Sequence, residues 1–438
     1  MLRGLSATGV ELDSLMHALG GGYLLPAPGA DPVRAGASAL PSGRNIHSID
    51  PWRLPSDGAT SRGWQMAEQL LIAHAASATQ RYPETVAMPL WALDTIKTEG
   101  ESIAAVLAMV GARPERDGQG KIWRYALIPL AELGRPRIDV LLDISSIFRD
   151  TFQLSLDLLD DLFRRAAEAE EPVEQNFLRA HVLDMVEHGH SWEQATARIF
   201  TQAPGKYGTG VDALVEESAW DQDHELAETF VKRGSHTYGG GRAGAPAPEV
   251  LRSLLGTVGH VFQAIDSVEY GLTDMQHYYG HSGAIQLAAR QASGGDVPLS
   301  YAETYTGSVR VSGATELLHI EARAKLLNPR WYEAMLSHGF SGAAEIGNRF
   351  SYLLGWSATT GKIDGWVYQG MAETFVLDET MRKRLEAANP RAACNAVARL
   401  LEAHGRGLWD ADELTVLQLQ EIYSDLEDRL EGTLEVGR

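Results

Sequence analysis

Cysteine is almost absent from this sequence, whose 438 residues include a single one, Cys394. One thiol can form neither an internal disulfide nor a thiolate metal site, and such usage is typical of a reducing cytoplasm. Uninterrupted apolar runs of about 18 residues are missing too, so we expect no membrane span. The first residues lack the apolar core of a signal peptide, and we therefore expect a cytoplasmic protein.

Positive charge is scarce relative to negative charge. Lys and Arg number 38 against 58 Asp and Glu, which leaves a net charge of −20. Such a surface repels nucleic acid and anionic membranes, so neither is an expected partner. The hydrophobic share of 44% and the charged share of 22% are ordinary for a globular protein, and the length favours two or three domains.

The motifs of common nucleotide and hydrolase sites are also missing. No G-x-x-x-x-G-K-[ST] string occurs, and the nearest one, GQGKI at 118–122, lacks the spacing and the hydroxyl. No G-x-G-x-x-G follows a predicted strand, and H-E-x-x-H and G-x-S-x-G do not occur. We therefore expect this chain neither to bind nor to hydrolyse ATP by itself.

Short apolar runs alternate with helical patterns in residues 63–170. This alternation predicts an α/β domain with a parallel sheet and helices on its faces. The strand candidates are 85–93, 125–129 and 138–144. The helix candidates are 64–79, 101–110 and 152–169.

The rest of the chain has a different pattern. Residues 1–62 are rich in turn-forming residues, and beyond a short helix at 12–19 we expect an extended segment that completes an upstream domain. Residues 171–310 are predicted to be mostly helical, with a glycine-rich loop at 203–211 and a more mobile one at 238–248. Residues 311–438 are predicted to form a helical C-terminal domain. The expected fold class is thus α/β followed by mainly α.

Three clusters of polar residues are candidates for chemistry. The first comprises Arg44, Asn45 and His47 after a glycine turn, and Asp50 follows. These side chains could converge on a ligand. The alternative is a surface loop held by local hydrogen bonds.

The second cluster follows the first predicted strand and contains Asp94, Lys97, Glu99 and Glu101. Ligands of open α/β sheets lie beyond the carboxyl ends of strands. Two carboxylates near a lysine could accept protons or hold a hard cation. The alternative is capping of the helix that follows, because acidic residues favour a first turn.

The third cluster contains His277, Tyr278 and His281, with the two imidazoles four residues apart and therefore on one face of a helix. The alternative is a half-buried aromatic turn, since Gly280 weakens the helix prediction. A weaker set of histidines is interpreted as surface or capping residues: His181, His188 and His190.

Arginines flank the last predicted strand of the α/β region. Arg135 precedes the strand and Arg149 follows it, next to Asp150. A pair of guanidinium groups could hold a carboxylate through two parallel hydrogen bonds. The alternative is a structural Arg–Asp pair that fixes the strand ends.

Taken together, these strings resemble the large-subunit family of magnesium chelatases and cobaltochelatases. They include LPSGRNIHSIDP, IKTEGES, LGRPRIDVLLDISSIFRDTF and PGKYGTGV. The matching segments occur in family order over essentially the whole chain, at 40–51, 96–102, 133–152, 176–181, 204–211, 326–336, 355–368 and 423–432.

The segments EARAKLLNPRWYEAML and YSDLEDRLEG are similar to the magnesium branch. One departure is that the family's large subunit is much longer, and this chain begins within its pattern. Either the gene is split or truncated, or the chain is a fragment, and a separately encoded N-terminal portion is a possible partner.

The resemblance implies a three-component machine in which this subunit binds protoporphyrin IX, Mg²⁺ is a substrate, and AAA-type partner subunits use the ATP. Within it, Glu99 and Glu101 would deliver the metal, and His47 and His277 would accept pyrrole protons. These four are expected to share a cleft. The expected substrate-binding residues are Arg44, Asn45, Lys97, Arg135, Arg149 and Tyr278.

Two alternatives remain at this point. One is a cobaltochelatase subunit that acts on a corrin precursor. The other is a tetrapyrrole-binding or sensing protein without catalytic activity.

Overall fold

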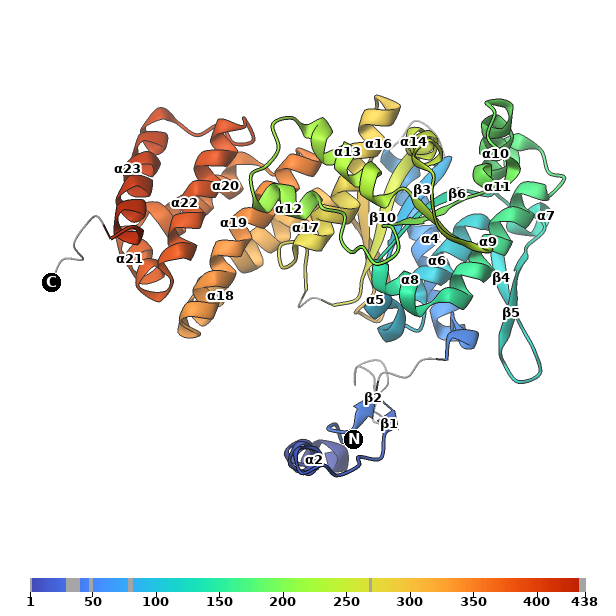
Figure 1. Ribbon diagram of the computed structural model, residues 1–438, viewed down its shortest axis with the longest axis horizontal. Helices are drawn as coiled ribbons and strands as arrows, with labels where there is room; N and C mark the ends of the chain where they lie inside the picture. Colours follow the sequence, from blue (N-terminus) through green and yellow to red (C-terminus); the bar gives the residue numbers. More distant parts are fainter. Residues whose placement is uncertain (1, 29–39, 47–49, 78–81, 268–269, 433–438) are drawn as a thin grey trace. The chain divides into compact units, whose positions relative to one another are not determined.

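The computed structural model describes residues 2–28, 40–46, 50–77, 82–267 and 270–432, and the chain forms two compact units (Figure 1). The first unit comprises residues 1–201 with 237–245 and 307–309. The second comprises 202–236, 246–306 and 310–438. The finer domain boundaries expected from the sequence stay predictions.

A sheet forms the centre of the first unit, with strand order β3-β6-β7-β8-β9. Strands β3 and β6 are parallel along their whole length, and β6 is parallel to β7. All residues of β3 and β6 are buried, which explains why they read as continuous apolar runs. The predicted parallel sheet is confirmed. The strands are β3 (Thr85–Leu90), β6 (Asp139–Ile144), β7 (Ile199–Thr201), β8 (His236–Gly239) and β9 (Arg242–Pro246).

The third predicted strand, 125–129, exists but belongs to a separate hairpin. β5 (Ile122–Leu127) pairs antiparallel with β4 (Ala112–Arg116), and Figure 1 shows this hairpin extending from the sheet. The sequence pattern does not predict β4, because its residues are mostly charged or half-exposed. Two short strands near the N-terminus form their own parallel pair, β1 (Ala27–Pro28) and β2 (Asn45–Ile46).

Helix α6 (Glu101–Val110) is buried over its entire length, in agreement with its apolar sequence. It ends at Gly111, which has a left-handed backbone, so both predicted ends are confirmed. A Cβ on Gly63 of α4 would lie 2.4 Å from the Cβ of Ala104, so this glycine lets the two helices touch. The helices of the first unit are α1 (Leu2–Ser6), α2 (Val10–Leu19), η2 (Pro51–Arg53), α4 (Asp57–Ser77), α5 (Ala92–Lys97), α6, α7 (Leu130–Leu133), α8 (Ser146–Thr151), α9 (Gln153–Glu168), η3 (Val173–Gln175), α10 (Phe177–Glu187) and α11 (Trp192–Ala195).

The glycine-rich segment at 238–248 is predicted to be a mobile loop, and the structure instead places most of it in the turn and strand of the β8–β9 hairpin. Three consecutive glycines from Gly239 have positive φ, a backbone that only glycine adopts readily. A Cβ on Gly240 would lie 2.1 Å from Oδ2 of Asp160. The glycines therefore serve a tight turn.

A buried charge cluster lies at the amino end of β6. The carboxylate of Asp139 accepts from Arg198 Nε at 2.7 Å and lies 2.8 Å from His181 Nδ1. Asp139 and Arg198 have no exposed surface. The interpretation of His181 as a surface residue is thus wrong, because the imidazole fills a polar niche that only the fold creates. His188 is exposed and contacts a carbonyl at the end of α10, as predicted.

This cluster predicts how the stability of the first unit depends on pH. Burial acts to lower the pKa of His181, but the hydrogen bond and charge of Asp139 prevail, and the pKa lies above its ordinary value. A raised folded pKa gives stability that is complete below the unfolded value and is lost as pH rises through the folded one. In His181→Gln, the free energy of unfolding should lose this decline, which lies above the ordinary pKa of histidine, as urea titrations at several pH values would measure. An unchanged pH profile would contradict the assignment.

The second unit contains strands in the order β12-β11-β10 and a large set of helices. β10 (Val258–Ile265) and β11 (Leu299–Glu303) are parallel, and β12 (Arg310–Gly313) is antiparallel to β11. The prediction of a mostly helical 171–310 overlooked these strands and β7 to β9. The apolar run of β10 has no clear alternation, so pattern alone does not separate it from a buried helix.

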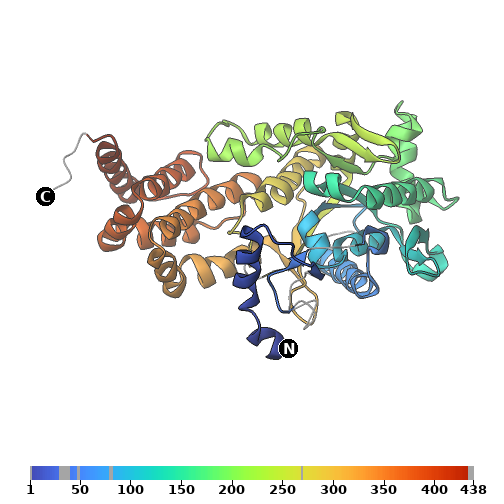
Figure 2. The same ribbon diagram turned by 60° about the horizontal axis from the view of Figure 1, so that its bottom comes forward.

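The predicted helical region after residue 311 is confirmed. Helix α22 packs between α19 and α23, and Figure 2 shows this group of helices in orange and red. Helix α19 contains several glycines, and close packing against neighbouring residues accommodates them. The helices of the second unit are α12 (Val211–Glu216), α13 (Asp223–Gly234), α14 (Pro248–Thr257), α15 (Gln276–Tyr278), η4 (Tyr279–Gly283), α16 (Ala284–Ser293), α17 (Ala314–Glu321), η5 (Ala322–Leu326), α18 (Pro329–Ser337), α19 (Phe340–Thr360), α20 (Gly365–Ala372), η6 (Glu373–Leu377), α21 (Glu379–Ala388), α22 (Pro390–Gly405) and α23 (Glu413–Leu430).

Within the described ranges, none of the helices combines the length and the apolar character that crossing a membrane requires.

Candidate functional site

Glu99 presents an exposed carboxylate beyond the carboxyl end of β3, in the turn between α5 and α6. Its backbone has a left-handed φ of 53°, and its carbonyl accepts a 3.0 Å hydrogen bond from the N–H of Ser56. Residues with side chains rarely adopt this φ, and such strain is concentrated at functional sites. The fold thus fixes this backbone at the edge where α/β sheets bind ligands.

Glu101 is buried in the first turn of α6. Its Oε1 lies 2.9 Å from Nε of Arg62, and its N–H donates to Thr98 Oγ1 at 3.2 Å. This is the geometry of the capping alternative, in which an acidic residue stabilises the positive end of a helix. Of the two glutamates, Glu99 is therefore the one whose carboxylate is open to a ligand. Lys97 lies nearby in the last turn of α5 and is half-buried.

Across the described part of the chain, no three His, Cys, Asp or Glu side chains are arranged to hold a metal ion. A carboxylate that meets a hydrated Mg²⁺ needs no such cage, because this ion keeps several waters and often binds through one or two carboxylates. The metal-delivery role of Glu99 and Glu101 stays a prediction.

Arg135 holds the end of α6. Its guanidinium donates to the carbonyls of Ala108 and Met109, and Arg137 donates to those of Val110 and Gly111. The last carbonyls of a helix have no partner within it, so these two arginines satisfy them and complement the helix dipole. A groove of about 590 Å³ lies beside Arg135, walled in part by Trp64 and Tyr82. The guanidinium is committed to the helix end rather than to this groove.

Arg149 lies at the other end of β6, so the structure does not bring the two flanking arginines together. Its Nε and one terminal nitrogen donate to the two carboxylate oxygens of Asp150, at 2.7 and 3.0 Å. This hydrogen bond raises the pKa of Arg149. The guanidinium also lies over the ring of Tyr238, 5.7 Å from its centroid. The structural Arg–Asp pair was the alternative interpretation, and the pair is present.

The segment around Arg44 forms the short strand β2. Arg44 is exposed, and its carbonyl accepts a 2.9 Å hydrogen bond from the N–H of Ala27. Asp50 accepts from the N–H of Trp52 at 3.0 Å, which is the local capping expected of a turn. Asn45 belongs to β2, and His47 lies outside the described residues.

In the second unit, His277 and Tyr278 belong to the short helix α15, and His281 lies in η4, a π-helical turn. The Nδ1 of His277 is 4.0 Å from Oδ2 of Asp212, and the imidazole is about half exposed. Burial, and next the charge of His281, lowers the pKa of His277, while Asp212 acts to raise it. An imidazole with a lowered pKa is neutral near pH 7 and can accept a proton.

Tyr278 is buried, and its hydroxyl donates to the carbonyl of Tyr270 at 3.3 Å. Its ring packs edge-on against Tyr301, with 6.1 Å between centroids. The alternative of an aromatic turn thus describes Tyr278, while His277 remains accessible. π-Helical turns are rare and occur frequently at functional sites.

The carboxylate of Asp212, which lies near His277, was missed in the sequence. Asp212 and Glu216 lie four residues apart on α12, and burial together with the Asp212 charge raises the pKa of Glu216. The only sequence signal for these carboxylates was their spacing after the glycine-rich turn at 208–210. Nothing in the sequence pairs residue 212 with residue 277.

The predicted convergence of His47, Glu99, Glu101 and His277 stays a prediction. His47 lies outside the described residues. The two glutamates belong to the first unit and His277 to the second.

The chain is similar to known proteins along almost its whole length. A family model described as CobN/Magnesium Chelatase matches residues 1–416. The chain therefore belongs to the CobN/magnesium chelatase family.

Individual relatives come from both branches of this family. The H-type subunit of the magnesium chelatase from Chlorobaculum parvum is 51% identical over 434 residues, which are 99% of this chain and 34% of the relative. The CobN subunit of the aerobic cobaltochelatase from Sinorhizobium sp is 32% identical over 410 residues, or 91% of this chain and 32% of the relative. The chain thus spans about a third of the length of these relatives.

A solved structure has the same fold. The catalytic subunit of cobaltochelatase from Mycobacterium tuberculosis matches with a TM-score of 0.93 and 32% sequence identity. The match covers 97% of this chain and 36% of that one.

Proposed function

We propose that this chain is the C-terminal part of the porphyrin-binding large subunit of a magnesium chelatase, which inserts Mg²⁺ into protoporphyrin IX for (bacterio)chlorophyll synthesis. The observation that carries the proposal is the difference between 51% identity to a magnesium-chelatase subunit and 32% to a cobaltochelatase subunit over nearly the same residues. AAA-type partner subunits would use ATP, and the cytoplasm would be the site of action.

The chemistry of insertion assigns different tasks to the candidate residues. Mg²⁺ loses its water reluctantly and prefers oxygen ligands, which suits the exposed carboxylate of Glu99. Two pyrrole protons must leave the macrocycle, and the neutral imidazole of His277 can accept one. Tyr278 supports the position of His277 through its own packing. For the carboxylates of the porphyrin the proposal keeps Arg44, Asn45 and Lys97, while Arg135 is occupied by α6 and Arg149 by Asp150.

A cobaltochelatase that acts on a corrin precursor is the second candidate, because the solved structure with TM-score 0.93 is a cobaltochelatase subunit. The two candidates differ in metal and macrocycle. Offering Mg²⁺ with protoporphyrin and Co²⁺ with a corrin precursor to the same complex, with ATP and the partner subunits, distinguishes them. A tetrapyrrole sensor would bind a macrocycle and insert neither metal.

Glu99→Gln is expected to slow metal insertion by roughly 10²-fold while the Kd for protoporphyrin changes less than about twofold. The reason is that a charge acting on the moving metal counts mainly in the transition state. Single-turnover insertion and fluorescence titration measure the two quantities. Glu132→Gln, which removes an exposed carboxylate of the same unit, is the matched control. Equal losses of binding and stability would instead assign Glu99 a structural role.

A further inference from the structure

The loop that precedes His277 is held by an unusually complete set of hydrogen bonds. It comprises residues 270–274 and connects the segment after β10 with α15. All four N–H groups from Gly271 to Asp274 donate to an acceptor, and the carbonyls of Tyr270, Gly271 and Leu272 accept. α15 is the first turn of a continuous helix that runs through η4 into α16, so this loop fixes the end at which that helix begins.

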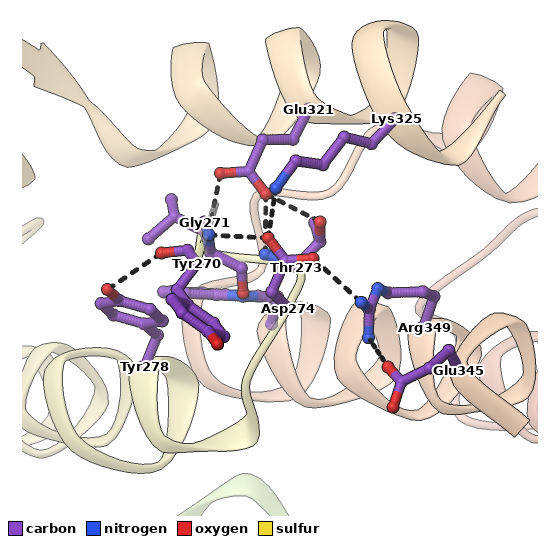
Figure 3. A network of polar contacts seen from close by, with 11 residues as sticks. Tyr270, Gly271, Thr273, Asp274, Tyr278, Glu321, Lys325, Glu345 and Arg349 are labelled. Carbon is purple, nitrogen blue, oxygen red and sulfur yellow. Dashed lines mark hydrogen bonds and ion pairs between the residues drawn. The ribbon is translucent and has the colours of Figure 1, made fainter. Parts of the chain in front are cut away.

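The carboxylate of Glu321 makes the main contact with this loop. Its Oε1 accepts from the N–H of Leu272 at 2.7 Å, and its Oε2 accepts from the N–H and the hydroxyl of Thr273 at 2.8 and 2.7 Å (Figure 3). A Cβ on Gly271 would lie 2.3 Å from Oε1, so the carboxylate packs directly on the glycine. The glycine and the glutamate, 50 positions apart in the sequence, therefore form one fitted contact.

Asp274 closes the loop from the other side. Its Oδ2 accepts from the N–H of Gly271 at 2.6 Å and is paired with Lys325 of η5, while its Oδ1 accepts from Arg349 of α19 at 2.9 Å. Figure 3 shows these cations on two different helices. The indole of Trp356, also on α19, donates to the carbonyl of Leu272 at 2.9 Å. The loop is thus fixed to α17, η5 and α19 at once.

The segment after His277 is fixed to α19 as well. A Cβ on Gly355 would lie 2.5 Å from the ring of Tyr279, and a Cβ on Gly283 would lie 2.5 Å from Oγ1 of Thr359. Contacts this close leave η4 no freedom to shift along α19. His277 is therefore the exposed member of a segment that is held rigidly before and after it.

From this geometry we propose that Glu321 and Asp274 are positioning residues that fix the imidazole of His277 for proton transfer. The proposal rests on the proposed function of His277, and it gives both carboxylates a role that acts through the loop. Catalytic groups must be held to within about 0.5 Å by their supporting shell, which is what the carboxylate–loop contacts supply. The alternative is that the network only stabilises the fold of the second unit.

The first test measures the titration of His277 by NMR in the purified chain. Its imidazole faces His281 of η4 and Asp212 of α12, with Glu216 on the same helix as Asp212. The side-chain amide of Glu321→Gln has one oxygen and one NH2 group, and the NH2 group cannot accept a hydrogen bond. One of the two backbone N–H donors of the loop therefore loses its acceptor, and this should release the loop. The pKa of His277 should then rise toward its ordinary value, and amide exchange of residues 271–278 should accelerate at least about tenfold. Glu316→Gln, an exposed change on the same helix, should alter neither quantity.

A second variant approaches the same contact from the loop. Gly271→Ala should displace the Glu321 carboxylate and reproduce the His277 shift, while Gly313→Ala, whose Cβ meets nothing within 4 Å, should not. Asp274→Asn keeps the shape of the side chain, and it replaces Glu321→Gln or Gly271→Ala in this test if either of these variants fails to fold. An unchanged His277 pKa in the folded variants overturns the proposal.

A double-mutant cycle in the complete chelatase tests independently whether Glu321 acts on metal insertion through His277. If Glu321 acts through His277, then Glu321→Gln should slow insertion in the wild-type background and by less than about twofold in His277→Ala. Full additivity overturns the positioning role. Should His277→Ala leave insertion unchanged, the proposed function of His277 fails, and the NMR shift still decides whether Glu321 positions the imidazole.

Discussion

Asp139→Asn is expected to destabilise the first unit by about 3–5 kcal/mol, because it leaves a buried arginine without its counter-charge. Arg198 is fully buried, and its Nε donates to Asp139 at 2.7 Å. Its remaining bonds go to the neutral carbonyls of Ala195 and Ala197. An amide can keep one hydrogen bond, but it cannot replace the charge.

Urea unfolding of the purified chain measures this effect. The control is Asp161→Asn, because that carboxylate also pairs with an arginine, at 2.9 Å from Arg165 Nε, but is 41% exposed. Exposed pairs are worth about 1 kcal/mol or less, so the control should shift the midpoint only slightly. If the two variants lose similar stability, the buried cluster does not stabilise the first unit as proposed.

The pKa of Asp139 lies below its usual range. Burial acts to raise this pKa, but the charges and hydrogen bonds of Arg198 and His181 together lower it by more.

His277→Ala is expected to give the largest functional effect, a loss of roughly 10²–10³-fold in kcat for metal insertion with porphyrin affinity nearly unchanged. A base contributes only while the proton moves, so binding of the macrocycle should be spared. Burial and His281 lower the pKa of the imidazole, which keeps it neutral at pH 7. Insertion should therefore decline as pH falls through this lowered pKa.

The measurement is the rate of magnesium protoporphyrin formation across pH in the reconstituted complex. Asp212→Asn removes the charge that raises the pKa of His277, so the acid limb should move to lower pH. His338→Ala, an exposed histidine of the same unit, is the control. An acid limb that is unchanged in Asp212→Asn, or full activity in His277→Ala, would exclude the imidazole as the base.

The α/β region was readable from the sequence where local signals agree with the fold. The apolar runs of β3 and β6 predicted buried parallel strands, and the helix predicted at 101–110 has the same bounds as α6. β10 was missed because a strand buried on both faces has no alternation. The partner of β5 was missed because strand pairing depends on the turn between the strands rather than on composition.

The candidate site was readable only in part. Glu99 and His277 were chosen as candidates because polar residues at element ends are typical of binding sites, and their roles stay predictions. The structural contacts of Glu101 and Arg135 became visible only with their neighbours, Arg62 and the carbonyls at the end of α6. Such partners come from distant positions and leave no spacing in the sequence.

The contact between Glu321 and the 270–274 loop is a further example of a contact that the sequence does not predict, because its residues are far apart in the chain. The carboxylate and its two N–H donors are 48 and 49 positions apart. No motif connects them, and Gly271 reads as an ordinary loop glycine until the carboxylate is seen to pack on it.

The most direct test of the proposed function is metal insertion by a complex that contains this chain. The purified chain would be combined with the remaining portion of the large subunit, both ATPase subunits, ATP, Mg²⁺ and protoporphyrin IX, and compared with the mixture that lacks it. We predict that magnesium protoporphyrin, followed by its fluorescence, forms only when the chain is present. Insertion of cobalt into a corrin precursor instead, or porphyrin binding without insertion of either metal, would contradict the proposal.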